Sequence, residues 1–134
     1  MNARVITLCH DVAIVTVGMI RRFGRSWPSA MADLVDDPAG ICEVPGTVTV
    51  SSTCENGIYS TEIGFRVSPA GPEEATLLES LRHSRLLAFY TDESGARRVC
   101  GSPDWPLHLD YRTEGGTCAC TLTGSDTAPD CWLR

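Results

Sequence analysis

Residues 47–67 read TVTVSSTCENGIYSTEIGFRV, and apolar side chains recur in this stretch with a period of two. In its first half Val48 and Val50 fall on one face and threonines on the other, as in a half-buried strand. Asn56-Gly57 then favours a tight turn, because both residues adopt positive φ at low cost. The stretch therefore predicts an antiparallel hairpin about this turn, whose buried residues include Val50, Ile63 and Phe65.

Regular patterns continue on the C-terminal side of the hairpin. Pro72 suits the first turn of a helix, where its missing N–H costs nothing, and Glu73 and Glu74 lie at the positive end of the helix dipole. Leucines at helical spacing follow, so an amphipathic helix is predicted at about 72–83. Beyond it, alternating or continuous apolar runs predict four strands: Leu86–Thr91, Ala96–Cys100, Leu107–Arg112 and Thr117–Thr123.

The first third of the chain has weaker patterns. Strands are indicated at residues 4–8 and 12–20, whereas residues 24–46 hold three prolines and few periodic apolar residues. A long loop is therefore predicted at 24–46, and long loops in compact domains often bind or assemble. Together these elements predict one domain over residues 1–134, mainly β, formed as an antiparallel sandwich or a partly open barrel with one short α-helix.

Composition narrows the class of protein. The chain of 134 residues is long enough for one core, its net charge is -6, and all of its 11 basic residues are Arg. An acidic domain without a basic stripe is a poor phosphate binder, so no nucleic-acid partner is expected. The longest apolar run, Val12 to Ile20, is too short to cross a bilayer, and Cys9-His10-Asp11 interrupts any secretory signal. Synthesis in the cytoplasm is expected, with export the less favoured alternative.

Seven cysteines are many for this length, and an odd number leaves at least one unpaired. Without an export signal, reduced thiols that pack as small hydrophobes are the expectation, although disulfides remain open. Cys118 and Cys120 project to the same side of their predicted strand. A structural zinc site needs four ligands, and Cys100, His108 and Cys131 could complete one only if the fold happened to bring them together. Packing is therefore predicted for both cysteines, and no metal or other cofactor.

No catalytic constellation is predicted. Cys9-His10-Asp11 resembles a nucleophile, base and carboxylate in a row, but neighbours in a strand point in opposite directions. The pair Glu73-Glu74 is explained by the helix dipole, and Asp36-Asp37 by a solvated loop. The sequence thus predicts that the protein is not an enzyme.

Three tryptophans stand in segments expected to be irregular: Trp27, Trp105 and Trp132. A large aromatic side chain in such a place either covers the core or anchors an interface. Arg25 lies close to the first of them, and guanidinium groups suit interfaces. These four residues are the interface candidates.

One part of the chain resembles a known group of proteins. The stretch Leu86 to Asp92 (LLAFYTD), the stretch Arg98 to Leu107 (RVCGSPDWPL) and the strand Thr117 to Gly124 (TCACTLTG), followed by Pro129, are similar to small structural proteins encoded in prophages of gut Bacteroidetes. The likeness covers about Leu77 to Trp132. It implies a virion component of the tail or head-to-tail junction, assembled from copies of itself or with other virion proteins. The cysteine content departs from this group.

Two other classes remain. A disulfide-supported extracellular binding domain is the main alternative, because the cysteines could bridge in an oxidising compartment. A small metalloenzyme or thiol enzyme is the third. Intact bridges would favour the former, and bound metal the latter.

Overall fold

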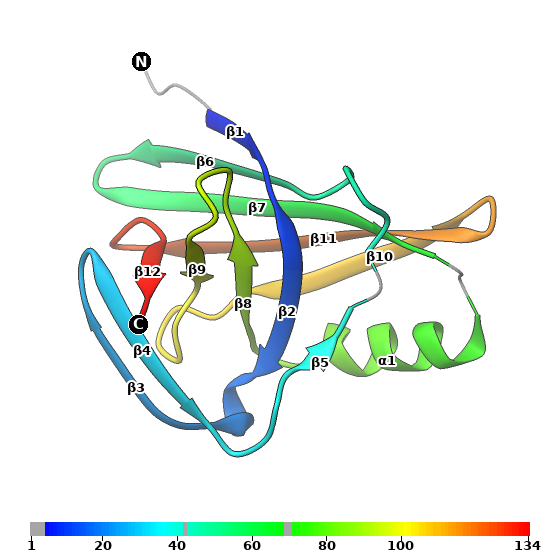
Figure 1. Cartoon of the computed structure of the whole chain (residues 1–134), viewed down its shortest axis with the longest axis horizontal. Coiled ribbons are helices and arrows are strands. Elements are labelled where there is room, and N and C mark those ends of the chain that lie inside the picture. The colour runs from blue at the N-terminus through cyan, green and yellow to red at the C-terminus, as the bar shows by residue number, and fades with distance from the viewer. Residues whose placement is uncertain (1–4, 42, 69–70) are drawn as a thin grey trace.

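The computed structural model describes residues 5–41, 43–68 and 71–134. Two β-sheets face each other, and one short α-helix lies beside them (Figure 1). The described strand pairings are antiparallel except for one short parallel pair. The predicted fold class is confirmed, as a β-sandwich with one short helix.

The first sheet, sheet A, has five strands in the order β1-β6-β7-β11-β10. Their bounds are Val5–Leu8 (β1), Thr49–Glu55 (β6), Ile58–Val67 (β7), His108–Glu114 (β10) and Thr117–Asp126 (β11). The predicted hairpin is confirmed as β6–β7, with Val50 opposite Ile63. Its turn uses positive φ at Asn56 (53°) and Gly57 (77°), as the sequence required.

The second sheet, sheet B, has seven strands in the order β3-β4-β12-β9-β8-β2-β5. Their bounds are His10–Thr16 (β2), Ile20–Ser26 (β3), Ser29–Leu34 (β4), Ala39–Gly40 (β5), Leu86–Thr91 (β8), Arg97–Cys100 (β9) and Cys131–Leu133 (β12). The four strands predicted after the helix are confirmed as β8, β9, β10 and β11.

One length of chain belongs to both sheets. β1 pairs with β6 in sheet A, β2 pairs with β8 in sheet B, and only Cys9 lies between them. The amide of Cys9 donates to the carbonyl of Val48 at 3.0 Å, and Asp11 adopts a φ of 53° where the register of β2 shifts. The chain therefore passes from sheet A to sheet B at Cys9, and the bulge follows within β2.

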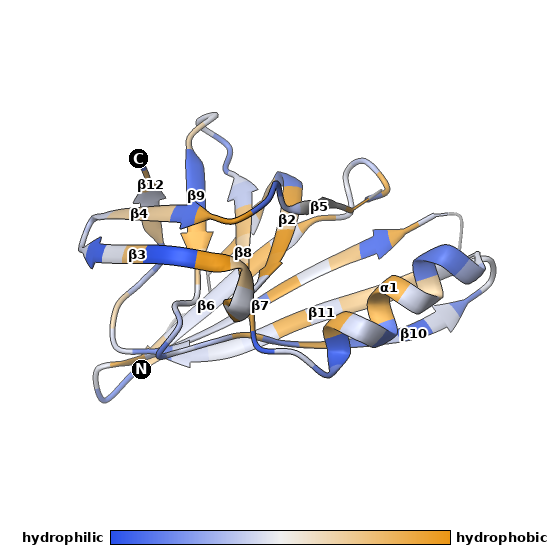
Figure 2. Ribbon diagram, turned by 90° about the horizontal axis from the view of Figure 1, so that it is seen from below, coloured by the Kyte–Doolittle hydropathy of each residue, from blue (hydrophilic) through white to orange (hydrophobic). Residues whose placement is uncertain are grey.

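The main core fills the space between the inner face of sheet A, sheet B and the helix α1 (Pro72–Arg82). Phe65 is 3% exposed and Ile63 is fully buried, as predicted. Leu78 and Leu81 bring the apolar stripe of α1 into this core, and the hydroxyl of Tyr111 on β10 donates to Glu79 at 2.6 Å. Figure 2 shows α1 alongside β10 and β11.

A second apolar cluster lies on the other face of sheet B. β8 is buried on both faces: Leu86, Ala88 and Tyr90 belong to the main core, and Leu87 and Phe89 to the second cluster. A short 3-10 helix, η1 (Val17–Met19), leads from β2 into β3 at the far end of the strand order. β2 and β3 lie far apart in the strand order of sheet B, yet the three residues of η1 join them. Sheet B must therefore curl, which brings the β3–β4 hairpin over the second apolar cluster.

The loop predicted at 24–46 is wrong from Gly24 to Leu34, where most of the β3–β4 hairpin lies. The pattern was missed because the side chains that β4 turns to the second cluster include small ones, Ala30 and Ala32. Two methyl groups give a weak apolar signal. Between residues 35 and 46 the described residues hold little regular structure beyond β5. Cys42 lies outside the described residues.

Candidate interaction surface

The structure places the three predicted tryptophans on the surface. Trp27 lies in the turn between β3 and β4, Trp105 in the segment before β10, and Trp132 in β12. Their exposed fractions are 55%, 41% and 42%. The expectation that all three lie in irregular segments is wrong for Trp132, because a strand of three residues gives no readable period. As interface candidates they satisfy the first requirement, which is exposure.

Two of the tryptophans lie close together in space. β12 pairs with β4 in parallel, with Trp132 opposite Ser29, and the amide of Trp132 donates to the carbonyl of Pro28 at 2.8 Å. Strand alternation places Met31 on the same face as Ser29, while Ala30 turns inward. Met31 is 41% exposed. We call Trp27, Met31 and Trp132 the tryptophan patch.

Trp105 is held near the same end of the molecule. It lines a small hollow together with Arg25, and Arg25 also lines the wider hollow that contains Trp27. The loop that carries Trp105 is fixed by paired backbone bonds with Ser102, each of 3.1 Å. Its ring is therefore exposed on an ordered loop, and residues that the sequence singled out separately come together in the fold.

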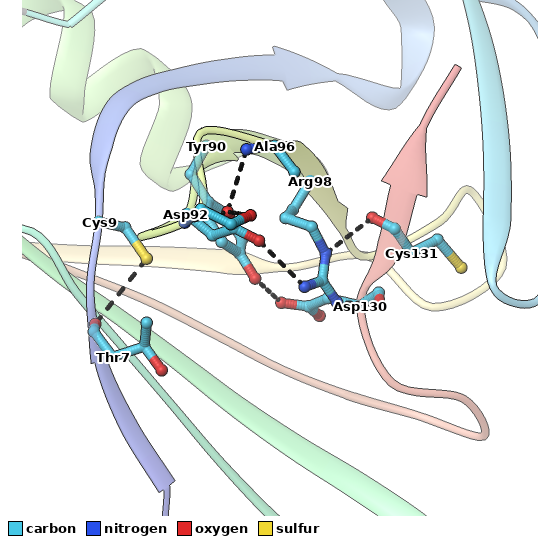
Figure 3. A network of polar contacts seen from close by, with 9 residues as sticks. Thr7, Cys9, Tyr90, Asp92, Ala96, Arg98, Asp130 and Cys131 are labelled. Atoms are coloured by element: carbon cyan, nitrogen blue, oxygen red, sulfur yellow. Dashed lines mark hydrogen bonds and ion pairs between the residues drawn. The ribbon is translucent and has the colours of Figure 1, made fainter.

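Trp132 rests on a positioned arginine. The guanidinium of Arg98 lies 3.9 Å from the centre of the Trp132 ring, a cation–π contact. Arg98 donates to the carbonyl of Asp130 at 2.7 Å, to the carboxylate of Asp92 at 3.3 Å and to the carbonyl of Cys131 at 3.4 Å (Figure 3). Because these bonds fix the guanidinium, the indole is held in place before any partner arrives, which lowers the entropy lost on binding.

Arg25 is used inside the chain. Its guanidinium donates to the Asp126 carboxylate in a bidentate pair at 2.5 and 2.9 Å, with side-chain exposures of 19% and 12%. The hydrogen bond that Arg25 donates to Asp126 raises the pKa of Arg25. This pair ties β3 to the end of β11. The interface candidate Arg25 therefore has a role within the chain, because its guanidinium holds the hairpin on the sandwich.

The thiols behave as the packing residues that the sequence predicted. The six described cysteines are free, and Cys118 and Cys120 are 1% and 2% exposed in the main core. Burial raises the pKa of Cys120 to about 12. Across the described ranges, no group of three His, Cys, Asp or Glu side chains is placed to hold a metal ion.

The double variant C118V/C120V is expected to fold with a change in unfolding free energy below about 1.5 kcal/mol, because both positions receive apolar groups of similar size. Thermal melts of both proteins measure it. Zinc bound stoichiometrically to the native protein, and lost in the double variant, would overturn the assignment of these thiols to packing.

The residues that resembled catalytic groups do not converge. The side chains of His10 and Asp11 do meet, at 3.7 Å, on the surface, where they are 59% and 76% exposed, but Cys9 is 4% exposed and belongs to the main core. His108 is exposed on β10, and His83 lies 3.2 Å from Glu79 on the surface of α1. These positions offer no nucleophile with a base beside it.

Comparison of the chain with protein-family models, curated proteins and solved structures gives no match. The one α-helix of the described segments, at 11 residues, is not long enough to cross a membrane. The interaction surface is therefore assigned from the geometry of this chain alone.

Proposed function

We propose that the protein is a structural subunit of a phage-like virion, in its tail or head-to-tail junction, and that it docks through the tryptophan patch. Its partner is a copy of itself or another virion protein. The observation that carries the proposal is that three large apolar side chains are exposed on adjacent segments: Trp27 and Met31 line one hollow, and Trp132 lies on β12, which pairs with β4. The sequence resemblance to prophage structural proteins supplies the biological setting: synthesis in the cytoplasm followed by assembly into a particle.

The chemistry of the patch suits protein contact. Tryptophan, methionine and arginine are enriched at interfaces, and a few aromatic side chains supply most of the binding energy there. The nearby edge strand β3 carries Arg21 and Arg22, both within 3.8 Å of the Asp33 carboxylate. Charged side chains on an edge strand discourage strand addition. Docking at this end therefore uses side chains rather than a continued sheet.

The test is the W27A/M31A double variant. Neither side chain belongs to the apolar clusters, so the fold and its thermal midpoint should persist. We expect the association constant, for self-assembly or for binding to products of neighbouring genes, to fall by at least tenfold. Sedimentation velocity over a concentration series and pull-down from co-expressed neighbours measure the two cases.

A matched control is I6A, which removes a still more exposed apolar side chain (66%) from β1, outside the patch. It should associate as the native protein does. Deleting the whole hairpin is a poorer test, because it would uncover the second apolar cluster. A native chain that stays monomeric at high concentration and captures no neighbouring gene product would refute the proposal.

A further inference from the structure

The inner face of sheet A changes character along its strands. In the middle of the sheet Val50 and Ile63 are buried in the main core. Two residues further along each strand, the inward pair is Ser52 and Thr61, and the next is Cys54 and Tyr59. Inward positions of a sandwich are normally apolar. The polar pairs therefore mark an end of the sandwich where the two sheets do not close on each other.

A pocket of about 350 Å³ occupies this end. Sheet A supplies the hydroxyls of Ser52 and Thr61 and the ring of Tyr59, while Tyr90, Asp92 and Asp130 come from the opposite side. Figure 3 shows Cys9 and Tyr90 around the same space, with the hydroxyl of Tyr90 donating a hydrogen bond to the carboxylate of Asp130. The walls come from β1, β6, β7, β8 and β9 and from the segments that follow β8 and β11.

The charge of the pocket is acidic. Asp92, Glu93 and Asp130 line it, against one arginine, Arg98. Arg98 offers little to a ligand, because its nitrogens donate to oxygens of Asp92, Asp130 and Cys131 and its face is covered by Trp132. An anion entering the pocket would meet carboxylates without a free guanidinium to pair with.

Titration behaviour agrees with this charge. Burial, and after it the charges of Asp92, Glu93 and Asp130, raise the pKa of the Cys9 thiol to about 11. Burial disfavours a charge of either sign, so only the contribution of the three carboxylates to the Cys9 shift bears on the charge of a ligand, and it favours a positive one.

We infer that this pocket binds a small organic cation of the alkylammonium class. The ammonium group pairs with the carboxylates of Glu93 and Asp130, the hydroxyls of Ser52 and Thr61 accept its N–H bonds, and the tyrosine rings and Val50 contact its alkyl chain. The pocket lining shares no residue with the tryptophan patch, although the two meet where Arg98 contacts Trp132, and the inference does not depend on the proposed assembly role.

Titration of the ¹⁵N-labelled protein with n-butylammonium chloride tests the inference. Saturable amide shifts are expected at Thr61, Ser94 and their pocket neighbours. The dissociation constant should be on the order of millimolar, because the ligand has few atoms. Sodium butyrate, n-butanol and sodium chloride at equal concentrations should not produce them. The same shifts with sodium chloride or butanol, or no saturable shifts with butylammonium, would overturn the inference.

Two variants locate the site. E93Q should weaken butylammonium binding about fivefold, whereas the matched control E73Q, on the exposed first turn of α1, should leave it unchanged. S52L should fill the pocket and abolish the shifts, while the dispersion of the amide spectrum shows that the protein remains folded. Equal affinity in E93Q, E73Q and S52L would place the cation elsewhere and refute the assignment.

Discussion

Replacing Phe65 with Ala is expected to lower the free energy of unfolding by about 3 to 5 kcal/mol. Phe65 is 3% exposed and lies on the inner face of β7, opposite Cys120 of β11 and within the main core. The substitution removes a ring from a packed interior, so it loses both the transfer energy and the contacts around the new cavity. Urea denaturation followed by far-ultraviolet circular dichroism measures the loss.

The control for this variant is I58A, at the start of the same strand. Ile58 is 39% exposed, so its truncation should cost much less. Equal stability of F65A and the native protein would show that the register of β7, and with it the inner face of sheet A, is incorrect.

Replacing Arg25 with Ala should cost about 3 kcal/mol, because the Asp126 carboxylate would remain partly buried without its bidentate partner. Asp126 would keep only backbone bonds, from Thr127 at 2.6 Å and Ala128 at 3.3 Å. The β3–β4 hairpin would lose its tie to sheet A, so local opening should accompany the loss. Hydrogen exchange of the hairpin amides, together with urea denaturation, measures both effects.

A double-mutant cycle with R25A, D126A and the double variant isolates the pair. Strong coupling is expected, since each substitution removes the same contact. The exposed pair between Arg66 and Glu114, at 2.9 Å, is the matched control and should show a much smaller loss in R66A. Additive effects at Arg25 and Asp126 would mean that the hairpin is held by other contacts.

Sequence patterning predicted the regular half of this fold. The β6–β7 hairpin was legible because valines and aromatic residues alternate on both sides of Asn56-Gly57, so local pattern and turn chemistry agree. The helix was legible because Pro72 and two glutamates mark its start. Each of these signals lies within a dozen residues of the element that it specifies.

The missed elements depend on distant residues. β12 has three residues and forms because β4 and β9 provide edges on both sides. β3 has an arginine or glycine at four of its seven positions and is stabilised by the curl of sheet B and by the Arg25–Asp126 pair. No window of sequence contains those partners, so periodicity could not find these strands.

The candidate sites divide in the same way. The tryptophans could be selected from the sequence because they stand in segments without a readable apolar period, although their exposure and proximity could not. The acidic pocket could not be found, because its lining comes from strands far apart in the chain. One local signal was present: Thr61 and Tyr59 occupy inward positions of β7 where an apolar residue is expected.

The place of β12 in sheet B also sets the order in which the chain folds. The β3–β4 hairpin forms from residues 20–34, but the strand that joins it to β9 comes from residues 131–133. During synthesis nearly a hundred further residues must emerge from the ribosome before β12 can join the hairpin to β9. Such long-range closure slows folding and leaves the nascent chain open to aggregation. We therefore expect sheet B to refold slowly after dilution from denaturant, and the chain to need chaperones in the cell.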